Sequence, residues 1–598
     1  MAKRLWLGLT FLAAGFALAL IVRWWQAPDL LAQRISPLPQ DPLVRVFMNH
    51  NPAASYREPY RSQTRPGDNL EQIIVDQIRV AKGSVDIAVQ ELRSPLIAQA
   101  LRDRHRAGVR VRLILENIYS RPWSSITAAE AQTFDARMQE RYRDNLRLID
   151  HNQDGQLSPT EIQTYDALAI IRQASIPWLD DTADGSAGSG LMHHKFVVVD
   201  GQQVIVTSAN LTLSDLHGDL KSPKSLGNPN SLVQIQSPAI AQLFAEEFNL
   251  MWGDGPGGQP DSRFGVKKTF RAVQSIAVGA GTIQVKFSPT SATIPWQSST
   301  NGLIAQSLSN SRKTIDLALF VFSDQQIANA LEPPVQQGTT LRVLIEPTFA
   351  YQYYSEALDL LGAALPARTV QKTKDQNVND PQAKNQPAKN LPAKAAQSEP
   401  SGDRCGMEPD NQVWERPIQT VGIPLLPPGD LLHHKFGIVD ERTVIIGSHN
   451  WTEAADYQND ETLLVIQNPR VAAHYTQEFN RLWANSRLGL PQRLQKKIQE
   501  KTSTLAACRT QSRVTASSAV PELATGSLAA GSLAAGTKVN LNTASLQDLE
   551  QLPGVGQKLA QRIIAARQRK PFQSLNDLDQ VSGVGPKLLQ QLGDRVTW

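Results

Sequence analysis

The sequence predicts an α/β fold built from two similar halves, followed by a small helical module. One short motif occurs twice in the chain, and each copy follows the same order of segments. That order is strand, helix, strand, which is typical of a mainly parallel sheet with helices on both faces. Near the C-terminus, two glycine-containing hairpins lie between short helical segments and predict a separate all-α module.

The two halves occupy residues 41–255 and 280–487, and a chain of 598 residues is long enough for several domains. Short apolar runs rich in β-branched residues indicate buried strands. The runs cover residues 85–89 and 107–114 in the first half and 315–319 and 341–345 in the second, around helical stretches at 96–107 and 325–335.

Both copies of the repeated motif have the pattern H-x-K-x4-D-x7-S-x-N. Residues i and i+2 of a strand share a face, so the histidine and lysine of each copy should point the same way. A neutral imidazole can attack phosphorus while a second, protonated imidazole donates to the departing oxygen. The motif residues are His193, Lys195, Asp200, Ser208 and Asn210 in the first copy and His433, Lys435, Asp440, Ser448 and Asn450 in the second.

The other motif residues suit the same chemistry. Lysine ammonium groups, together with the serine and asparagine donors, stabilise phosphoryl oxygens as negative charge develops. Asp200 and Asp440 are expected to hold an imidazole in one tautomer and to stabilise its protonated form. The pair of motifs therefore predicts a phosphodiester-cleaving site with a covalent step.

At these residues the chain resembles the phospholipase D superfamily, which is characterised by this duplicated motif. The resemblance implies two α/β/α lobes, related by pseudo-two-fold symmetry, that place both motifs in one cleft. It also implies a metal-independent reaction through a phosphohistidine. By resemblance His193 is the nucleophile, and His433 is the acid and then the base; the sequence leaves the reverse order open.

The two motifs differ in their surroundings. Members of the superfamily often carry a glycine before the serine, and a later glutamate that supports the histidine of the opposite lobe. The second half keeps both, as Gly447 and Glu461, whereas the first half has Thr207 and Asn230 at these places. The resemblance therefore implies that Glu461 supports His193 and that His433 has no equivalent support.

A twelve-residue stretch, 150–161, interrupts the first half and fits the calcium loop of an EF-hand. Gly155 provides the sharp turn at position 6, and helical segments are expected on both sides, within an insert at about 128–173. We expect a structural calcium site of modest affinity. Its predicted ligands are Asp150, Asn152, Asp154, Gln156, Ser158 and Glu161.

The N-terminal segment, residues 1–25, combines a basic flank with an apolar run and predicts export. An uninterrupted run into a tryptophan pair favours a retained membrane anchor, and a cleaved signal peptide is the alternative. An exported body suits calcium at extracellular levels. The chain has two cysteines, Cys405 and Cys508, and their pairing is left open.

Two stretches have the composition of unstructured chain. The first, 371–401, interrupts the second half, and the other, 509–537, is a linker of serine, alanine and glycine. The linker leads to the helical module at 538–598, which resembles the tandem helix-hairpin-helix domain of competence proteins. Its predicted DNA-binding residues are Gly554, Val555, Gly556, Lys558, Gly583, Val584, Gly585 and Lys587.

The glycines of the hairpins allow backbone N–H groups to approach phosphate oxygens, a contact that does not depend on base sequence. The module carries eight Lys and Arg against five Asp and Glu, while the whole chain has a net charge of only +4. The net charge therefore does not imply a broad basic surface. We expect an exported phosphodiesterase, either a non-specific nuclease on DNA or a phospholipase D on phospholipid headgroups. A non-catalytic DNA-capture receptor is the third alternative, and oligomeric state is left open.

Overall fold

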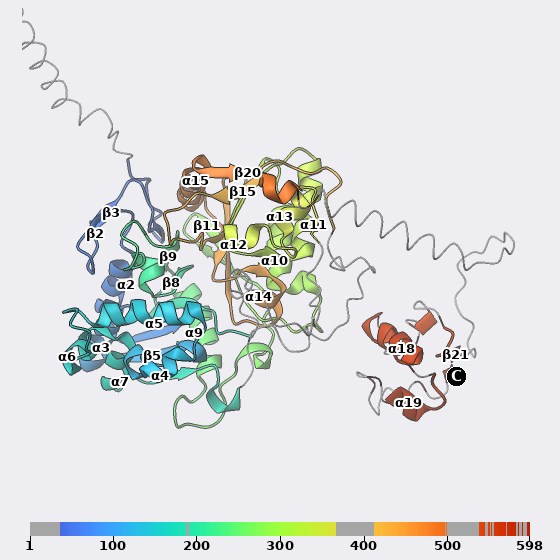
Figure 1. Ribbon diagram of the computed structural model, residues 1–598, viewed down its shortest axis with the longest axis horizontal. Helices are drawn as coiled ribbons and strands as arrows, with labels where there is room; N and C mark the ends of the chain where they lie inside the picture. The colour runs from blue at the N-terminus through green and yellow to red at the C-terminus, as the bar shows by residue number, and fades with distance from the viewer. Residues whose placement is uncertain are drawn as a thin grey trace, which may run out of the picture. The chain divides into compact units, whose positions relative to one another are not determined.

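The computed structural model describes residues 36–186, 190–365, 412–496 and 498, and parts of 538–597 (Figure 1). The N-terminal segment, the predicted unstructured stretches 371–401 and 509–537, and both cysteines lie outside the described residues. The chain forms two compact units, Met1–Val514 and Thr515–Trp598. No helix among the described residues is long and apolar enough to cross a membrane.

Lobe 1 of the larger unit is built on a seven-stranded sheet whose order is β1-β9-β8-β7-β4-β5-β6. Alternate residues of its strands face two different apolar clusters, as expected for a sheet covered on both sides. The strands are β1 (Val44–Met48), β4 (Ser84–Val89), β5 (Arg110–Leu115), β6 (Trp178–Asp180), β7 (Lys195–Val199), β8 (Gln203–Thr207) and β9 (Ser231–Gln236).

Lobe 2 has a nine-stranded sheet in the order β10-β11-β19-β17-β16-β12-β14-β15-β20. Its seven inner strands repeat the order of lobe 1, so the structure confirms the predicted duplication. The strands are β10 (Gln274–Val278), β11 (Gly281–Phe287), β12 (Thr314–Leu319), β14 (Thr340–Ile345), β15 (Val421–Pro424), β16 (Lys435–Val439), β17 (Thr443–Gly447), β19 (Thr462–Gln467) and β20 (Ser486–Leu488).

The sheets are mixed, so the expectation of a mainly parallel sheet is wrong. In lobe 1 only β4-β5 and β5-β6 pair in parallel, while the four pairings from β1 to β4 are antiparallel. The reason is that β7 returns to β8 through a tight turn at Asp200 and Gly201, both at positive φ. A hairpin reverses the chain, whereas parallel neighbours need a crossover connection.

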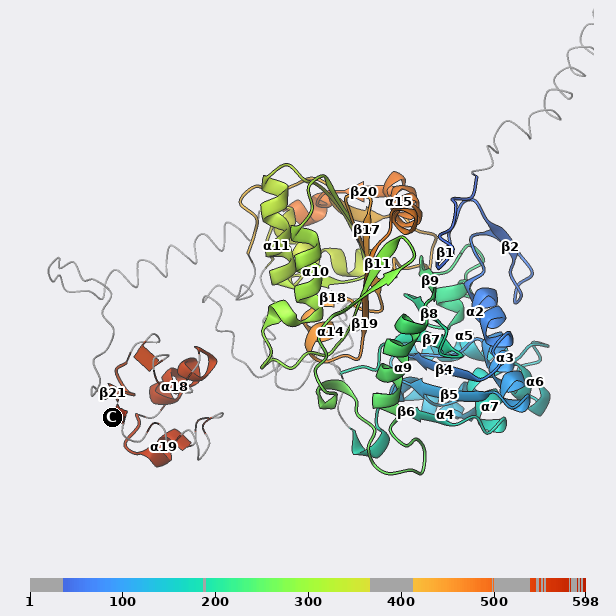
Figure 2. The ribbon, with the colours of Figure 1, turned by 180° about the vertical axis from the view of Figure 1, so that it is seen from behind.

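Helices cover both faces of each sheet (Figures 1 and 2). On the outer face of lobe 1, α2, α3 and α7 pack on one apolar cluster, and α10 and α11 do the same in lobe 2. The α/β class is thus confirmed. These helices are α2 (Leu70–Arg79), α3 (Pro95–Arg106), α7 (Ala167–Gln173), α10 (Thr300–Ser309), α11 (Gln325–Gln336), α12 (Pro347–Ala350) and α13 (Glu356–Leu360).

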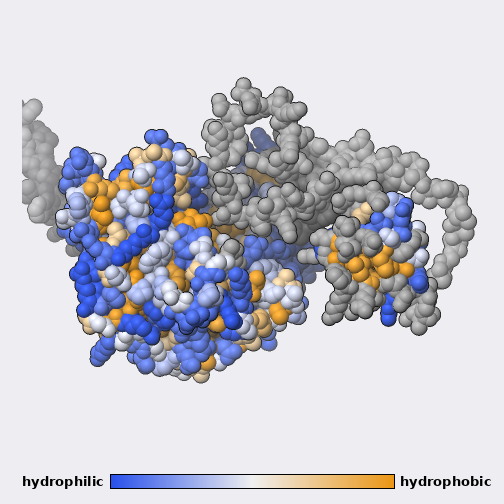
Figure 3. Space-filling model, turned by 90° about the horizontal axis from the view of Figure 1, so that it is seen from below, coloured by the Kyte–Doolittle hydropathy of each residue, from blue (hydrophilic) through white to orange (hydrophobic). Residues whose placement is uncertain are grey.

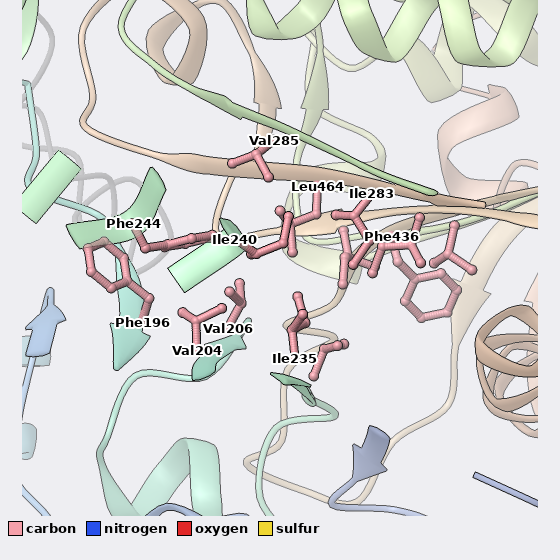
Figure 4. Packing of buried hydrophobic residues seen from close by; sticks show 14 of the residues in the cluster. Phe196, Val204, Val206, Ile235, Ile240, Phe244, Ile283, Val285, Phe436 and Leu464 are labelled. Atoms are coloured by element: carbon pink, nitrogen blue, oxygen red, sulfur yellow. The ribbon is translucent and has the colours of Figure 1, made fainter. Parts of the chain in front are cut away.

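The two lobes share one hydrophobic core, which contains residues of both sheets and of α9 (Pro238–Trp252) and α15 (Pro469–Ala484). Figure 4 shows Phe196 and Phe244 of lobe 1 and Phe436 of lobe 2 among its members. Burial of one such side chain contributes about 2 kcal/mol. This continuous core fixes the position of one motif relative to the other.

The predicted insert at 128–173 consists of four helices, of which α7 packs against α3 on the outer face of lobe 1. Two of them, α5 (Ala136–Ile149) and α6 (Pro159–Tyr165), flank the loop 150–161 as expected. The remaining short elements of the larger unit are β2 (Ser55–Arg57), β3 (Thr64–Pro66), β13 (Phe322–Ser323), β18 (Trp451–Thr452), α4 (Ala128–Gln132), α8 (Leu213–Leu216) and α14 (Glu453–Tyr457).

The smaller unit has its own apolar core, which includes Leu541, Ile563 and Val596. Its described elements are β21 (Val539–Asn540), α18 (Gln557–Arg569), α19 (Leu575–Asp579) and β22 (Val596–Thr597). On the face seen in Figure 3, hydrophilic and hydrophobic residues of both units are interspersed. Exposed large apolar residues such as Val80, Ile118 and Leu488 belong to separate elements, as on ordinary protein surfaces.

Candidate active site

The first motif lies at the start of β7, where lobe 1 meets lobe 2. The His193 amide donates to the Asp460 carbonyl of lobe 2 over 2.9 Å, which fixes the strand end across the lobe boundary. The Lys195 ammonium donates to the His193 carbonyl (2.9 Å) and to Gln90 Oε1 (3.3 Å). In lobe 2 the Lys435 ammonium donates to the His433 carbonyl, also over 2.9 Å.

His193 is supported by a glutamate of the opposite lobe, as the resemblance implied. Its Nδ1 lies 2.7 Å from Glu461 Oε2, and the Glu461 carboxylate is completely buried. Ser448 Oγ donates to the same oxygen and Asn459 Nδ2 to the other. Because a carboxylate accepts, His193 carries its proton on Nδ1 and leaves the lone pair of Nε2 free to attack.

His433 contacts an amide at the position where a glutamate supports His193, so its support is not equivalent, as expected. Its Nδ1 lies 3.0 Å from Asn230 Oδ1. Asn230 Nδ2 donates to the carbonyls of Asp215 and Asn228, so its Oδ1 must be the acceptor. His433 therefore also carries its proton on Nδ1. The Asp215 carboxylate lies 3.7 Å from the same nitrogen.

The motif serines bind the supporting residues rather than facing an open cleft. Ser208 Oγ donates to Asn230 Oδ1, and Ser448 Oγ donates to Glu461 Oε2, both over 2.7 Å. Their predicted role as donors to substrate is therefore wrong, because each hydroxyl has one proton and it is already used. Asn210 and Asn450 each have a buried amide oxygen with no partner among the described residues. The two amides remain the candidates for contact with a phosphoryl group.

Asp200 and Asp440 do not lie beside an imidazole, so their predicted role is wrong. The Asp200 carboxylate accepts from the backbone N–H groups of Lys82, Gly83 and Ser84. Asp440 accepts in the same way from residues 312–314. The physical reason is the length of the strand, since five residues place the aspartate about 16 Å beyond the lysine. Each aspartate thus holds the hairpin turn after its motif strand to the loop that leads into β4 or β12.

Burial changes the protonation of all four motif bases. Desolvation, followed by the charges of the two lysines, holds the pKa of His193 and His433 well below the ordinary value. Desolvation also lowers the pKa of Lys195 to about 8 and that of Lys435 to about 7. Both histidines are thus neutral in the free site. A bound phosphate anion between the lysines favours the protonated forms of all four groups.

Two glutamates, one in each lobe, position the motifs and were not predicted from the sequence. Glu116 and Glu346 accept from the backbone N–H groups of Met192 (2.6 Å) and Leu432 (2.7 Å), directly before the first histidine of each motif. Burial raises the pKa of Glu116 to about 8. Both glutamates follow immediately after a buried apolar strand, and this pattern could have identified them.

The second histidine of each motif points to the other face of the strand and was also missed. His194 contacts Glu247 of α9, and His434 contacts Glu478 of α15, with nitrogen–oxygen distances of 2.9 Å. Both histidines and both glutamates are buried. The alternation of side chains along a strand accounts for this placement. These contacts tie each motif strand to its C-terminal helix.

The predicted calcium loop is closed by its own hydrogen bonds. Asp150 accepts from the amides of Asp154 and Gly155, and Glu161 accepts from those of Asn152 (3.2 Å) and Ser158 (3.0 Å). Gly155 has a φ of +81°, as the turn requires. No three His, Cys, Asp or Glu side chains in the described part of the chain form a metal site. The oxygen donors of the loop 150–161 fit the preference of calcium, and calcium binding stays a prediction.

In the hairpins of the smaller unit, Val555 is 3% exposed in the core and Val584 packs against it. Their amides donate to the carbonyls of Leu552 and Val581 within the turns. The prediction that these valines bind DNA is therefore wrong. Of the other predicted contacts, the side chain of Lys558 and all of Gly554, Gly556, Gly583, Gly585 and Lys587 lie outside the described part.

The duplicated fold and the paired histidines define a family. The family model described as "Cardiolipin synthase, PLD-like domain" matches residues 74–252 and 304–483, and the chain belongs to this family. A helix-hairpin-helix motif model matches residues 534–597. The structure and these matches together confirm the two phospholipase D-like lobes and the C-terminal helix-hairpin-helix motif.

Short segments of the chain are similar to characterised proteins. A mitochondrial cardiolipin hydrolase from Chlamydomonas reinhardtii is 42% identical over 52 residues, 9% of this chain and 23% of that protein. The one from Mus musculus is 37% identical over 68 residues, covering 11% and 31%. A phospholipase D from Rickettsia typhi is 40% identical over 67 residues, covering 11% and 32%. The chain thus spans less than a third of each of these relatives.

Two solved structures are also similar. The phospholipase D family member Nuc from Salmonella typhimurium is 17% identical, with a TM-score of 0.23, covering 36% of this chain and all of that one. A phosphatidylserine synthase from Haemophilus influenzae is 12% identical, with a TM-score of 0.44, covering 79% and 95%. At these scores neither structure contributes to the functional argument.

Proposed function

We propose that the chain is an exported phosphodiesterase that cleaves DNA through a phosphohistidine. The observation that carries the proposal is the pair of buried histidines, each with Nδ1–H bound to a side chain of the opposite lobe, so that Nε2 carries the lone pair. Two ammonium groups, Lys195 and Lys435, lie beside them and would bind the phosphoryl oxygens. The helix-hairpin-helix match favours DNA among the phosphodiesters.

The reaction follows from the contacts of the two histidines. His193 Nε2 attacks phosphorus, the bond to the departing oxygen breaks, and that oxygen takes a proton from His433. A water molecule then gives its proton to His433 and attacks phosphorus, and the bond to His193 breaks. Glu461 favours His193 as the nucleophile, because its carboxylate stabilises the positive charge that the ring carries while phosphorylated.

DNA binding by the C-terminal module would raise the concentration of substrate near the site. A linked binding module needs only weak, sequence-independent affinity to have this effect. We propose that Gly554, Gly556, Gly583 and Gly585 of the hairpins contact the phosphate backbone, together with Lys558 and Lys587. Export through the N-terminal segment, whether retained as an anchor or cleaved, is part of the proposal.

A phospholipid substrate is the second candidate, because the printed names of the relatives are cardiolipin hydrolase and phospholipase D. The attack on phosphorus is the same, and only the groups on the phosphate differ. The third candidate is a DNA-capture receptor without catalysis, which Thr207 and Asn230 would suit because they replace the family's glycine and glutamate. It is disfavoured because Asn230 keeps a hydrogen bond to His433.

The test incubates the full chain with plasmid DNA and, separately, with phosphatidylcholine vesicles, with His193→Ala as the control. Loss of intact plasmid by the natural chain alone supports the nuclease. Headgroup release with intact plasmid supports the phospholipase. Plasmid bound but left intact, with no headgroup release, supports the receptor.

We also propose that the loop 150–161 binds calcium as a structural ion. The carboxylates of Asp150, Asp154 and Glu161 would supply its charge-bearing oxygens, and the pairing of α5 with α6 would depend on it. Millimolar calcium should raise the melting temperature of the natural chain, and Glu161→Ala should remove the increase. An unchanged melting temperature in the natural chain contradicts the proposal. Activity should persist in chelator, since no step uses a metal.

A further inference from the structure

We infer that Asp215 is the positioning carboxylate of His433, in place of the glutamate that lobe 1 lacks. The inference rests on the proposed phosphodiesterase reaction. Glu461 stands 28 residues after His433, whereas Asn230 stands 37 residues after His193. Asp215 lies in α8, between Asn210 and Asn230, and the extra residues of lobe 1 follow this helix.

The contacts of Asp215 point it at the active site from within the protein. It is 4% exposed, and its Oδ2 lies 3.7 Å from His433 Nδ1. The same oxygen accepts from the backbone N–H of Asn210 (2.8 Å), and Oδ1 accepts from Asn228 Nδ2 (2.5 Å). Its backbone carbonyl accepts from Asn230 Nδ2. Asp215 thus orients the amide that contacts His433 and adds a negative charge behind it.

Lobe 2 has no carboxylate at the corresponding place. Thr212 caps α8 by accepting from the Asp215 amide, and Thr452 caps α14 by accepting from the Ala455 amide. Asp215 and Ala455 are therefore equivalent positions. The neighbouring Asp456 accepts from the amide of Asn301 and does not face a catalytic histidine. Each histidine thus lies near one carboxylate of the opposite lobe. For His193 it is Glu461, which follows α14, and for His433 it is Asp215, which lies within α8.

The charges around His433 explain why this carboxylate matters. Lys435, Lys195, His193 and His434 all disfavour its protonated form. Burial raises the pKa of Asp215, and its hydrogen bonds to Asn228 and Asn210 oppose that rise. The charges of Lys435 and Lys195 oppose it as well and favour the ionised form. Among the described residues, Asp215 places a carboxylate 3.7 Å from His433 Nδ1 and opposes the charges of the two lysines there. Without it, His433 would hold a proton less readily and could not serve as the acid.

The longer distance from Asp215 to His433 also suits the two histidines to different roles. A direct contact with a carboxylate stabilises a charged ring more than a contact 3.7 Å away through an amide. His193, with the direct contact, is suited to the lasting positive charge of the phosphohistidine. His433, with the offset contact, is suited to releasing its proton.

The first experiment compares Asp215→Asn with Asp456→Asn, which removes an equally buried carboxylate from lobe 2. Asp215→Asn should lower kcat/KM on plasmid DNA by about 100-fold, the low end of the contribution of a general acid, because His433 itself is retained. On bis(p-nitrophenyl) phosphate the loss should be less than about 3-fold, because nitrophenolate leaves without a proton. Asp456→Asn should affect the two substrates equally. Equal losses for Asp215→Asn on both substrates would overturn the inference.

The second experiment needs no activity, so it still decides the inference if the proposed reaction is wrong. Histidine Cε1–H signals of the full chain, assigned with His433→Gln and His193→Gln, are titrated by NMR. Asp215→Asn should lower the pKa of His433 by about one pH unit or more and leave that of His193 nearly unchanged. Should that variant not fold, Asp215→Glu moves the charge and must still change the pKa of His433. An unchanged pKa of His433 contradicts the role of Asp215.

Discussion

The two halves of the active site have the same fold and different chemistry. Around His193, Nδ1 contacts the Glu461 carboxylate and the nearby Lys195 contacts the Gln90 amide. Around His433, Nδ1 contacts the Asn230 amide, and both the His433 ring and the Lys435 ammonium lie about 5 Å from the Phe320 ring. The comparison teaches that a duplicated fold can supply two unequal histidines, which a reaction with a nucleophile and an acid requires.

The largest expected effect comes from removing each histidine in turn. His193→Ala should reduce cleavage of both plasmid DNA and bis(p-nitrophenyl) phosphate by at least about 10⁴-fold, because the covalent step is lost. His433→Ala should abolish DNA cleavage and still release one burst of nitrophenolate, since that group needs no acid. Rapid-mixing absorbance measures the burst. A burst from His193→Ala and none from His433→Ala would reverse the two roles.

The next largest effect is expected from changing Glu461 and Asn230, the residues that support the two histidines. Glu461→Gln replaces a carboxylate by an amide at His193 and should lower kcat by about 100-fold, because the phosphohistidine loses its counter-charge. Asn230→Ala removes only a neutral acceptor from His433 and should lower kcat by about 10-fold. Steady-state kinetics on DNA measures both. Equal losses would mean that the two supports are equivalent and would break the comparison.

The lysines set the dependence on pH. An ammonium group is charged below its pKa, and burial lowers the pKa of Lys435 to about 7 and that of Lys195 to about 8. As pH rises through this range the free site loses positive charge, so kcat/KM should fall between about pH 7 and 9. Lys435→Arg, which stays charged, should move this decline to higher pH. A rate profile that stays flat to pH 9 contradicts the assignment.

The smallest expected effect on catalysis comes from the motif aspartates. Asp200→Ala removes the acceptor of three backbone N–H groups and should cost about 1–3 kcal/mol of unfolding free energy. Asp440→Ala should cost a similar amount, because its contacts are the same. Denaturant titration measures the loss. At a temperature where the variants are folded, kcat should change by less than about 3-fold, and a larger loss would restore a catalytic role.

Much of this architecture follows from local sequence patterns. The buried runs before each motif, their β-branched composition and the repeat itself predicted the two lobes, and the resemblance predicted the contact between Glu461 and His193. The parallel sheet was overestimated because the turn at Asp200 gives no signal that distinguishes a hairpin from a longer connection. The roles of the serines were wrong for a similar reason, since spacing does not show which partner a hydroxyl takes.

The residues that the sequence did not reveal act across long separations. Glu116 reaches the amide of Met192, and Asp215 of lobe 1 lies beside His433 of lobe 2. The first pair depends on how segments far apart in sequence meet within lobe 1, and the second on how the two lobes pack on a shared core. No period or motif within one segment encodes either of them. Asn230 departs from the family pattern in the sequence itself. The carboxylate that takes the place of the missing glutamate, Asp215, lies in α8, and the sequence does not indicate that α8 lies beside His433.

The most direct test of the account identifies the histidine that carries the phosphoryl group. The His433→Ala variant is mixed with bis(p-nitrophenyl) phosphate, quenched under alkaline conditions that preserve phosphohistidine, digested and sequenced by mass spectrometry. We expect the adduct on His193 and none in a parallel sample of His193→Ala. An adduct on another residue, or none in either sample, would contradict the central claim that His193, supported by Glu461, is the nucleophile.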